Sequence, residues 1–362
     1  GIGRVFGRCA AMAAFVGAIP GTLCLRSPCV RSAAVGALPV WSSRAIARCG
    51  SSGAAVSTAC RASASQASDV GSLSAVVTGA GSGIGRALCL VLAARGLRVI
   101  GVGRRRAALE ETRSLAAGAA AEQGRGHVEM EVLAGDVSRA SDRAALAEGV
   151  RAILAREGSV LHCLVHNAAV MGEVGPPSAL SEEGFRETMA TNVEGPLFLT
   201  RGLADDLALS PRGGRVLHIS SGAAHSALRG WLEYCTSKAA LLQLMRCLDA
   251  DLAPKVRVGS AMPGVVDTDM QASIRNCEFP DVAYFRSLRR APGEGIGQGP
   301  PAVPSSTALD RPDNVAQFLA WLLLDVPGDE FGGQEWDIND QSTQRRWLSQ
   351  ESGAAVADES WF

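Results

Sequence analysis

The sequence predicts an α/β fold in which a single doubly wound parallel sheet is covered by helices on both faces. From about residue 71 onward, short and uninterrupted apolar runs alternate with longer stretches of helical periodicity, as in parallel sheets buried on both faces. A glycine-rich turn at residues 79–85 follows the first apolar run and opens the first helical stretch. We therefore expect one folded domain over residues 71–345, with an unstructured leader at 1–70 before it and a tail at 346–362 after it.

The expected elements alternate between strand and helix along the chain. The apolar runs expected to form strands span residues 73–78, 97–102, 128–134, 160–166, 215–220, 256–261 and 334–338. The helical patterns lie near residues 84–95, 105–122, 139–156, 181–209, 231–252 and 312–324. Residues 276–311 interrupt this order, because they include a run rich in glycine and proline from Ala291 to Pro301 that does not support regular structure. Long irregular inserts are typical of functional loops, and we expect a substrate lid over about residues 267–311.

The leader differs from the rest of the chain in composition. Residues 1–70 hold seven arginines, no lysine and one acidic residue, Asp69. An Arg-, Ser- and Ala-rich segment almost free of acids is typical of an organellar targeting sequence; plastid and mitochondrion both stay open, and a cytoplasmic location is the alternative. The apolar stretch from Ala10 to Leu25 is short for a membrane span, so we expect no membrane association after leader removal. A weak membrane anchor or a plain disordered tail is the alternative interpretation.

Composition also excludes several classes of function. The chain is 47% hydrophobic and 20% charged, which supports a sizeable core and argues against global disorder. The part beyond residue 70 is acidic, with a net charge of −7, so no nucleic-acid partner is expected. The ten cysteines include no Cys-x-x-Cys pair and no Cys/His cluster with metal-ligand spacing. We therefore expect reduced thiols and no metal site.

The glycine-rich turn predicts a site for a dinucleotide. Gly79 permits a tight turn, Gly83 lets the backbone approach a diphosphate, and Gly85 lets the helix pack closely on the strand. The N-terminus of the following helix offers free N–H groups and a partial positive charge to phosphate. A lone glycine motif is weak evidence, but here a strand precedes it, a helix follows it and a second strand comes about 20 residues later. The candidate residues of the turn are Thr78, Gly79, Ser82, Gly83, Ile84 and Gly85.

The end of the second expected strand predicts which nicotinamide cofactor binds. An acidic residue there would bind the ribose 2′-hydroxyl of NAD, but Gly103 occupies the position and Arg104 and Arg105 follow it. Guanidinium groups suit a 2′-phosphate, so we predict NADPH rather than NADH. A solvated basic helix start is the alternative for both arginines.

The end of the third expected strand predicts the adenine site. Asp136 and Val137 follow this strand, and we expect them to contact the adenine. The alternative for Asp136 is a plain helix N-cap.

Tyr234 and Lys238 predict the chemistry. Four residues apart on an expected helix, the phenol and the ammonium share one face, and Ser221 lies 13 residues before the tyrosine at the end of an apolar run. Tyr234 is expected to act as the general acid of carbonyl reduction, with Lys238 lowering its pKa toward the working pH. Ser221 is expected to polarise and position the substrate oxygen.

These motifs resemble those of the short-chain dehydrogenase/reductase family, and the resemblance covers about residues 72–340. It implies a Rossmann fold and an NADP-dependent oxidoreductase in which Lys238 also binds the nicotinamide ribose. It further implies that Asn167 braces the central strands and that Asn192, in the segment Thr191–Gly195, holds a water linking Lys238 to solvent. An isolated helical asparagine is otherwise a kink or a cap. The nicotinamide-binding segment implied by the resemblance contributes Pro263, Gly264, Val266 and Thr268.

Two further stretches are similar to sepiapterin reductases and to the benzil reductases allied to them. These are Gly230-Trp231 before the tyrosine and the run from Val266 to Gln271. Asp337 matches the position at which an aspartate anchors the pterin in sepiapterin reductases, so we expect it to bind substrate. Trp231 is expected to line the substrate pocket, with simple packing as the alternative. The insert at 289–311 fits neither subgroup.

The leading hypothesis is an NADPH-dependent reductase of ketones or diketones, sepiapterin- or benzil-like. One alternative is a 3-oxoacyl-carrier-protein reductase, for which arginines at 275, 286, 289 and 290 would supply a basic patch. Another is a sensor that binds NADPH without turnover, although such proteins typically lose the tyrosine or the lysine. The resemblance implies a homodimer or homotetramer.

Overall fold

The computed structural model describes residues 72–122, 130–290 and 308–351. The leader expected at 1–70, the glycine- and proline-rich part of the insert and residues 352–362 of the expected tail lie outside the described residues, as do the side chains of residues 289 and 290.

A seven-stranded parallel sheet forms the centre of the fold, in the order β3-β2-β1-β4-β5-β6-β9. Its strands are β1 (Leu73–Thr78), β2 (Arg98–Gly103), β3 (Met130–Ala134), β4 (Val160–His166), β5 (Gly214–Ile219), β6 (Val256–Met262) and β9 (Glu335–Asp337). The order reverses between β1 and β4, so the two halves of the sheet diverge there and leave a crevice at the carboxyl ends of the strands. The predicted doubly wound fold is confirmed.

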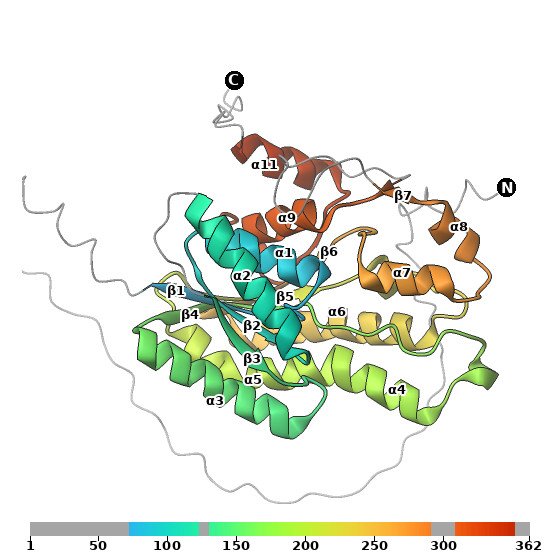
Figure 1. The fold of residues 1–362 in the computed structure, drawn as a ribbon, viewed down its shortest axis with the longest axis horizontal. Helices are drawn as coiled ribbons and strands as arrows, with labels where there is room; N and C mark the ends of the chain where they lie inside the picture. The colour runs from blue at the N-terminus through green and yellow to red at the C-terminus, as the bar shows by residue number, and fades with distance from the viewer. Residues whose placement is uncertain (1–71, 123–129, 291–307, 352–362) are drawn as a thin grey trace, which may run out of the picture. The chain divides into compact units, whose positions relative to one another are not determined.

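Helices cover both faces of the sheet (Figure 1). Over one face lie α1 (Gly83–Ala94), α2 (Arg106–Glu122), α9 (Pro312–Leu324) and α11 (Gln341–Glu351). Over the other lie α3 (Ala140–Glu157), α4 (Glu182–Met189), α5 (Gly195–Ala208) and α6 (Leu232–Leu252). Successive residues of β1 point to opposite faces of the sheet, as alternation along a strand requires. Ala75 and Val77 belong to the apolar core that includes residues of α1 and α9, whereas Val76 belongs to the core that includes residues of α3 and α5.

The helix expected at 181–209 is interrupted. A five-residue π-helical segment, Ala190–Glu194, separates α4 from α5 and carries Asn192. A π segment inserts an extra residue into the helical turn, and such segments are often found at functional sites. The apolar periodicity continues across it, which is why the sequence pattern gave no sign of the break.

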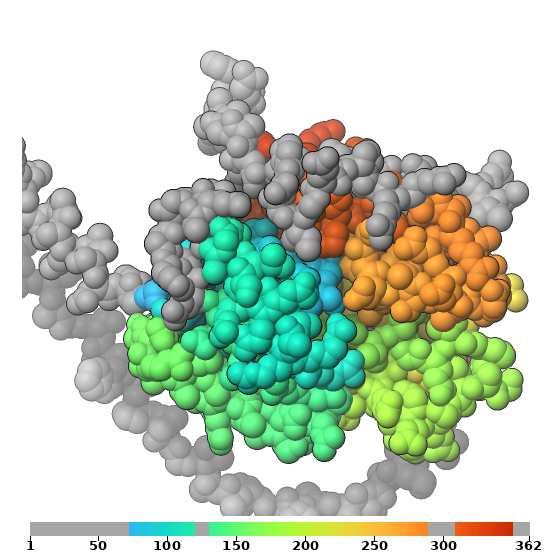
Figure 2. All heavy atoms as spheres, in the orientation of Figure 1, coloured from blue at the N-terminus to red at the C-terminus, as the bar shows by residue number. Residues whose placement is uncertain are grey.

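The predicted lid region contains regular structure that the sequence analysis did not expect. It holds α7 (Asp269–Asn276), α8 (Val282–Ser287) and a short parallel pair formed by β7 (Arg289–Arg290) and β8 (Ala308–Leu309). Thr268 caps α7, and α8 buries Val282 and Phe285. In the space-filling view the orange surface of α7 and α8 adjoins the yellow-green surface around α4 (Figure 2). The prediction of an irregular segment is therefore wrong for α8 and the strand pair.

The domain limit expected at residue 345 falls inside α11. Trp347 of this helix is fully buried, and its ring meets Phe318 of α9 edge-on at 5.4 Å between centroids. The folded unit therefore continues through α11. A short helix, α10 (Gly328–Phe331), completes this layer.

Candidate active site

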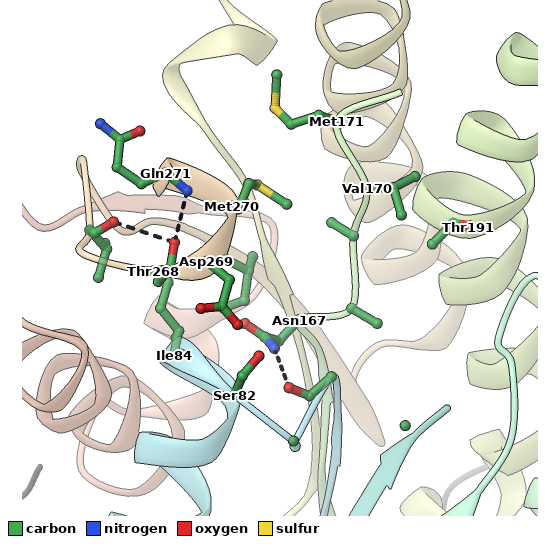
Figure 3. A pocket seen from close by; sticks show the side chains of 18 of the residues that line it. Ser82, Ile84, Asn167, Val170, Met171, Thr191, Thr268, Asp269, Met270 and Gln271 are labelled. Carbon is green, nitrogen blue, oxygen red and sulfur yellow. Dashed lines mark hydrogen bonds between the residues drawn. The ribbon is translucent and has the colours of Figure 1, made fainter. Parts of the chain in front are cut away.

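A cleft of about 460 Å³ lies at the carboxyl ends of the strands, where the sheet order reverses. Its lining includes four groups of residues: the glycine turn after β1, the segments at the ends of β2, β3, β4 and β5, the first turns of α6 with Tyr234 and Lys238, and the segment from Pro263 into α7. Figure 3 shows Ser82 and Ile84 on one side, Asn167 near the centre, and Val170 and Met171 leading away from it, with Met270 and Gln271 of α7 nearby. The predicted cofactor and catalytic residues thus converge on one cleft.

Three glycines of the turn leave little or no room for a Cβ atom. Gly79 has φ +69°, and a Cβ there would lie 2.7 Å from Asn167 Nδ2. A Cβ on Gly85 would lie 2.3 Å from the Gly79 carbonyl oxygen, whereas one on Gly83, at φ +52°, would meet Thr268 Cγ2 at 3.0 Å. Only glycine allows both the left-handed backbone and this close approach. Gly83 therefore faces Thr268 across the cleft, and Gly85 fixes the helix against the turn.

Thr78 and Asn167 brace the turn from behind. The Asn167 Nδ2 group donates to the Thr78 carbonyl at 3.0 Å and to the Gly79 carbonyl at 3.3 Å. The Thr78 hydroxyl accepts from the backbone N–H of Asn167 at 3.0 Å and donates to the Val165 carbonyl at 3.1 Å. These bonds join β1 to β4, which is the bracing role expected of Asn167.

The arginines expected at the 2′-phosphate line the same cleft. Arg104 and Arg105 are exposed, and neither forms an ion pair with another of the described residues. Arg106, by contrast, pairs with Glu110 at 3.5 Å and does not line the cleft. Two guanidinium groups at the cleft wall thus have their bidentate donors available to a phosphate.

Asp136 and Val137 line the cleft beside Gly135. The Asp136 carboxylate accepts from the backbone N–H of Ser138 at 3.0 Å and from its hydroxyl at 2.8 Å. The N-cap of α3 is Arg139, so the alternative interpretation of Asp136 as the cap is wrong.

Ser221, Tyr234 and Lys238 meet at the inner end of the cleft. Lys238 Nζ donates to the Ile219 carbonyl at 2.8 Å and lies 5.5 Å from the centre of the Tyr234 ring. Ser221 lies two residues after the end of β5 and caps the short turn Gly222–Ala224, where its hydroxyl accepts from Ala223 N–H at 3.2 Å. The i, i+4 spacing on α6 therefore places phenol and ammonium on one face, as predicted.

Burial governs the protonation of this group. It raises the pKa of Tyr234 to about 12, although hydrogen bonding with Ser221 acts in the opposite direction. It lowers the pKa of Lys238 from 10.5 to about 8. Desolvation disfavours the charged form of each group, so the pKa of Tyr234 lies above its ordinary value, and the prediction that it falls toward the working pH is not met in this structure.

Asn192 lies behind the cleft, where it holds the loop after β4. Its side chain accepts from the Val170 N–H at 2.9 Å and donates to the Val170 carbonyl at 2.8 Å and to the Ser237 hydroxyl at 3.0 Å. Both amide donors are used in this way. The expected water relay to Lys238 stays a prediction.

The part of the cleft beside Tyr234 is apolar. Its lining includes Met171, Trp231, Met270, Ile274 and Phe285. The Trp231 ring stacks on Phe285 at 5.1 Å and meets Tyr234 edge-on at 5.9 Å. Trp231 therefore both lines the cleft and packs, so the two interpretations of this residue combine.

Some residues of the site differ from expectation. Asp337, expected to bind substrate, does not line the cleft; its carboxylate accepts from Asn339 N–H at 2.8 Å at the end of β9. Thr78, Gly85 and Asn192 support the cleft from behind. The residues that sequence reasoning missed are Val170, Met171, Met270, Ile274 and Phe285. All are ordinary apolar residues, and a signal came from Met270, which lies in the run from Val266 to Gln271 that is similar to sepiapterin and benzil reductases.

The described residues lack two features. None of the helices there combines the length and the apolar character that a membrane span requires. Nor does this part of the chain contain a group of three or more His, Cys, Asp or Glu side chains placed to hold a metal ion.

Comparison with known proteins gives consistent matches. The protein family described as "short chain dehydrogenase" matches residues 74–278. An "Uncharacterized oxidoreductase" of Myxococcus xanthus (strain DK1622) is 33% identical over 253 residues, which cover 70% of this chain and 94% of that protein. The "(3R)-3-hydroxyacyl-CoA dehydrogenase" of Homo sapiens is 31% identical over 255 residues, covering 70% and 89%. The solved structure of the angucycline C-6 ketoreductase LanV with bound NADP is similar with a TM-score of 0.60 and 26% identity, covering 74% of this chain and 94% of that one.

Proposed function

The chain belongs to the short chain dehydrogenase family, and we propose that it is an NADPH-dependent reductase of ketones or diketones. One observation carries the proposal: Ser221, Tyr234 and Lys238 line the same cleft as the glycine turn. A proton donor is thus placed beside a site shaped for a dinucleotide.

The choice of NADPH rests on the cleft itself. Three glycines whose Cβ positions are blocked or strained form a cradle at the N-terminus of α1, suited to a diphosphate. Arg104 and Arg105 stand at the cleft wall beyond Gly103, where no acidic side chain competes for the ribose. The structural neighbour LanV was solved with bound NADP, which supports the same cofactor here.

The mechanism divides one hydride and one proton between two sources. When bound, NADPH supplies the hydride that reaches the carbonyl carbon. The Tyr234 hydroxyl gives its proton to the carbonyl oxygen, so that C=O becomes CH–OH and the phenol becomes a phenolate. Ser221 donates a hydrogen bond to the same oxygen and keeps it within reach of Tyr234. The Lys238 ammonium, 5.5 Å from the ring centre, favours the phenolate as it forms.

The substrate is proposed to be an apolar ketone or diketone of the benzil type. Support comes from the methionine and aromatic side chains beside Tyr234, which suit an apolar or aromatic substituent. A pterin is less favoured, because Asp337 does not line the cleft. A carrier-bound acyl chain is also less favoured, because Arg275 and Arg286 of the expected basic patch pair with Asp267 at 3.8 Å and Glu278 at 2.6 Å.

The test compares carbonyl substrates on the purified full chain. NADPH oxidation is followed with benzil, sepiapterin and an acetoacetyl thioester, in the wild type and in Tyr234→Phe. We expect benzil to be reduced, and the variant to lose on the order of 10²- to 10⁴-fold in rate while it still binds NADPH. Turnover of the thioester alone would instead favour an acyl substrate, as in the human hydroxyacyl-CoA relative. NADPH binding without any turnover would contradict the enzyme assignment.

The cofactor preference has a separate test at Arg104. Replacing it by serine removes a guanidinium but leaves the glycine cradle, so the KM for NADPH should rise about 10-fold or more, the scale of one lost charged contact. The KM for NADH should change little. Arg106→Ser is the matched control, because Arg106 pairs with Glu110 outside the cleft. An equal rise for both cofactors would argue against a 2′-phosphate contact.

A further inference from the structure

We propose that Glu233 is a positioning residue that anchors one wall of the substrate pocket, residues 170–173, to the catalytic helix α6. The proposal rests on the proposed carbonyl reductase activity and deepens it. It assigns to the residue just before the catalytic tyrosine a role in substrate placement rather than in proton transfer.

Glu233 is fully buried in the first turn of α6. Its Oε2 accepts from the backbone N–H of Glu173 at 3.0 Å and from the Thr188 hydroxyl at 2.8 Å. One carboxylate oxygen thus joins three segments: the loop after β4, the end of α4 and the start of α6. Oε1 is buried and has no hydrogen-bond partner among the described residues.

A buried carboxylate that accepts from only two neutral donors carries a desolvation penalty, which a purely structural position would not require. An apolar side chain of similar size would avoid the desolvation penalty. The partial positive charge at the N-terminus of α6 offsets part of that penalty. The residue type therefore indicates a need for a strong acceptor at this point, and the loop backbone donates its N–H group to that acceptor.

The loop is shaped to receive this carboxylate. Gly172 adopts φ +72°, and a Cβ there would lie 2.1 Å from Glu233 Oε2 and 2.4 Å from Thr188 Oγ1. The backbone of residue 172 therefore lies directly against the anchor. Neither the backbone conformation nor the space admits another residue.

The geometry of α6 connects the anchor to the chemistry. Glu233 and Ser237 are four residues apart on one face of the helix, and Tyr234 and Lys238 are four apart on the adjacent face. Ser237 receives a hydrogen bond from Asn192, whose side chain holds Val170 through both backbone groups. The loop is thus fixed at residue 170 through Asn192 and at residue 173 through Glu233.

The anchored loop forms the substrate side of the cleft. Val170 is one of the two fixed points, Met171 lies between them, and both residues line the cleft (Figure 3). Met171 also packs against the cluster that contains Trp231 and Tyr234. A shift of the loop would move this wall relative to the Tyr234 hydroxyl but would leave the glycine cradle in place. Loss of the anchor should therefore change substrate orientation and not cofactor binding.

The experiment uses Glu233→Ala and Glu233→Gln with 1-phenyl-1,2-propanedione, a prochiral diketone, and NADPH. The alanine variant should lose about 10- to 100-fold in kcat/KM, as expected for a misplaced substrate, and the enantiomeric ratio of its alcohol should fall. The dissociation constant for NADPH should stay within about twofold, since the cradle is intact. Glutamine keeps an acceptor oxygen for both donors and should restore most of the ratio. Glu187→Ala, on the exposed side of α4, is the matched control.

Hydrogen exchange at the Glu173 amide gives a readout that needs no turnover. This amide should exchange faster in Glu233→Ala than in the wild type or in Glu233→Gln. Thr188→Val, which removes one donor at similar volume, covers the case in which the alanine variant does not fold, and should alter the enantiomeric ratio in the same direction. Unchanged exchange at Glu173, or an unchanged product ratio in a folded alanine variant, would overturn the anchoring role. A wild type that reduces no carbonyl would overturn the proposed function, and the exchange data would then judge the anchor alone.

Discussion

At the scale of single residues, the site holds the transferable proton on Tyr234 and the positive charge on Lys238. Burial holds the pKa of Tyr234 at about 12 and lowers that of Lys238 to about 8. At neutral pH the phenol therefore keeps its proton, as a general acid must, and the lysine is the group close to titration. In the proposed mechanism, Tyr234 stays protonated until the carbonyl oxygen takes the proton.

This predicts the pH dependence of reduction. Lys238 is charged below its pKa of about 8 and loses its proton as the pH rises through that value, while Tyr234 stays protonated up to about 12. The ammonium that favours the phenolate is then lost, so kcat/KM should be level at pH 6–7 and decline about tenfold per pH unit above the Lys238 pKa. Steady-state kinetics from pH 6 to 10 measure this profile. A plateau that extends to pH 10 would show that the charge of Lys238 does not matter.

Residues with unusual chemistry were the ones that the sequence revealed. Few other functions would explain why a glycine-rich turn, the adjacent Arg104 and Arg105, Tyr234 and Lys238 occur in that order. Glu233 and Met171 gave no such signal, because a glutamate in a helix and a methionine in a loop are usually solvated or packed. The role of Glu233 depends on contacts with residues 45 and 60 positions away in the chain, which a sequence pattern does not record.

At the scale of elements, length decides what the sequence could predict. The seven strands of the sheet and the long helices carry enough residues for their apolar pattern to be visible. The helices α7 and α8 span only eight and six residues, less than the window that periodicity requires. The π segment Ala190–Glu194 was also missed, because a single extra residue hardly disturbs the pattern on either side.

The strands β4 and β5 carry three buried histidines, which predicts sensitivity to acid. Burial lowers the pKa of His162 to about 4, that of His218 to about 3, and that of His166 well below 6.5. Between those values and 6.5 the unfolded chain binds more protons than the folded one, so stability is lost as the pH falls through this window. Urea unfolding at pH 7, 5.5 and 4.5 should show a steeper decline for the wild type than for His218→Gln. The half-exposed His225→Gln is the control, and equal slopes in all three proteins would contradict the prediction.

At the scale of the whole molecule, the C-terminal helix belongs to the core. Trp347 is fully buried against Phe318, so Trp347→Ala should lower the free energy of unfolding by roughly 3–5 kcal/mol. The exposed Arg345→Ala should change it by less than about 0.5 kcal/mol. Urea denaturation of the two variants measures the difference. A small effect at Trp347 would restore residue 345 as the end of the folded domain.

The late position of α9 and α11 in the chain affects how the protein is made. These helices cover the face of the sheet that α1 also covers, and Arg215 of β5 donates to the Leu322 carbonyl at 2.7 Å near the end of α9. During synthesis, β1 to β6 leave the ribosome before α9 and α11, which cover part of this face. A nascent chain ending before about residue 320 therefore exposes an apolar surface wide enough for a chaperone to bind. Ribosome-bound chains that end before α9 should be captured by chaperones, whereas chains that have released α11 should escape them.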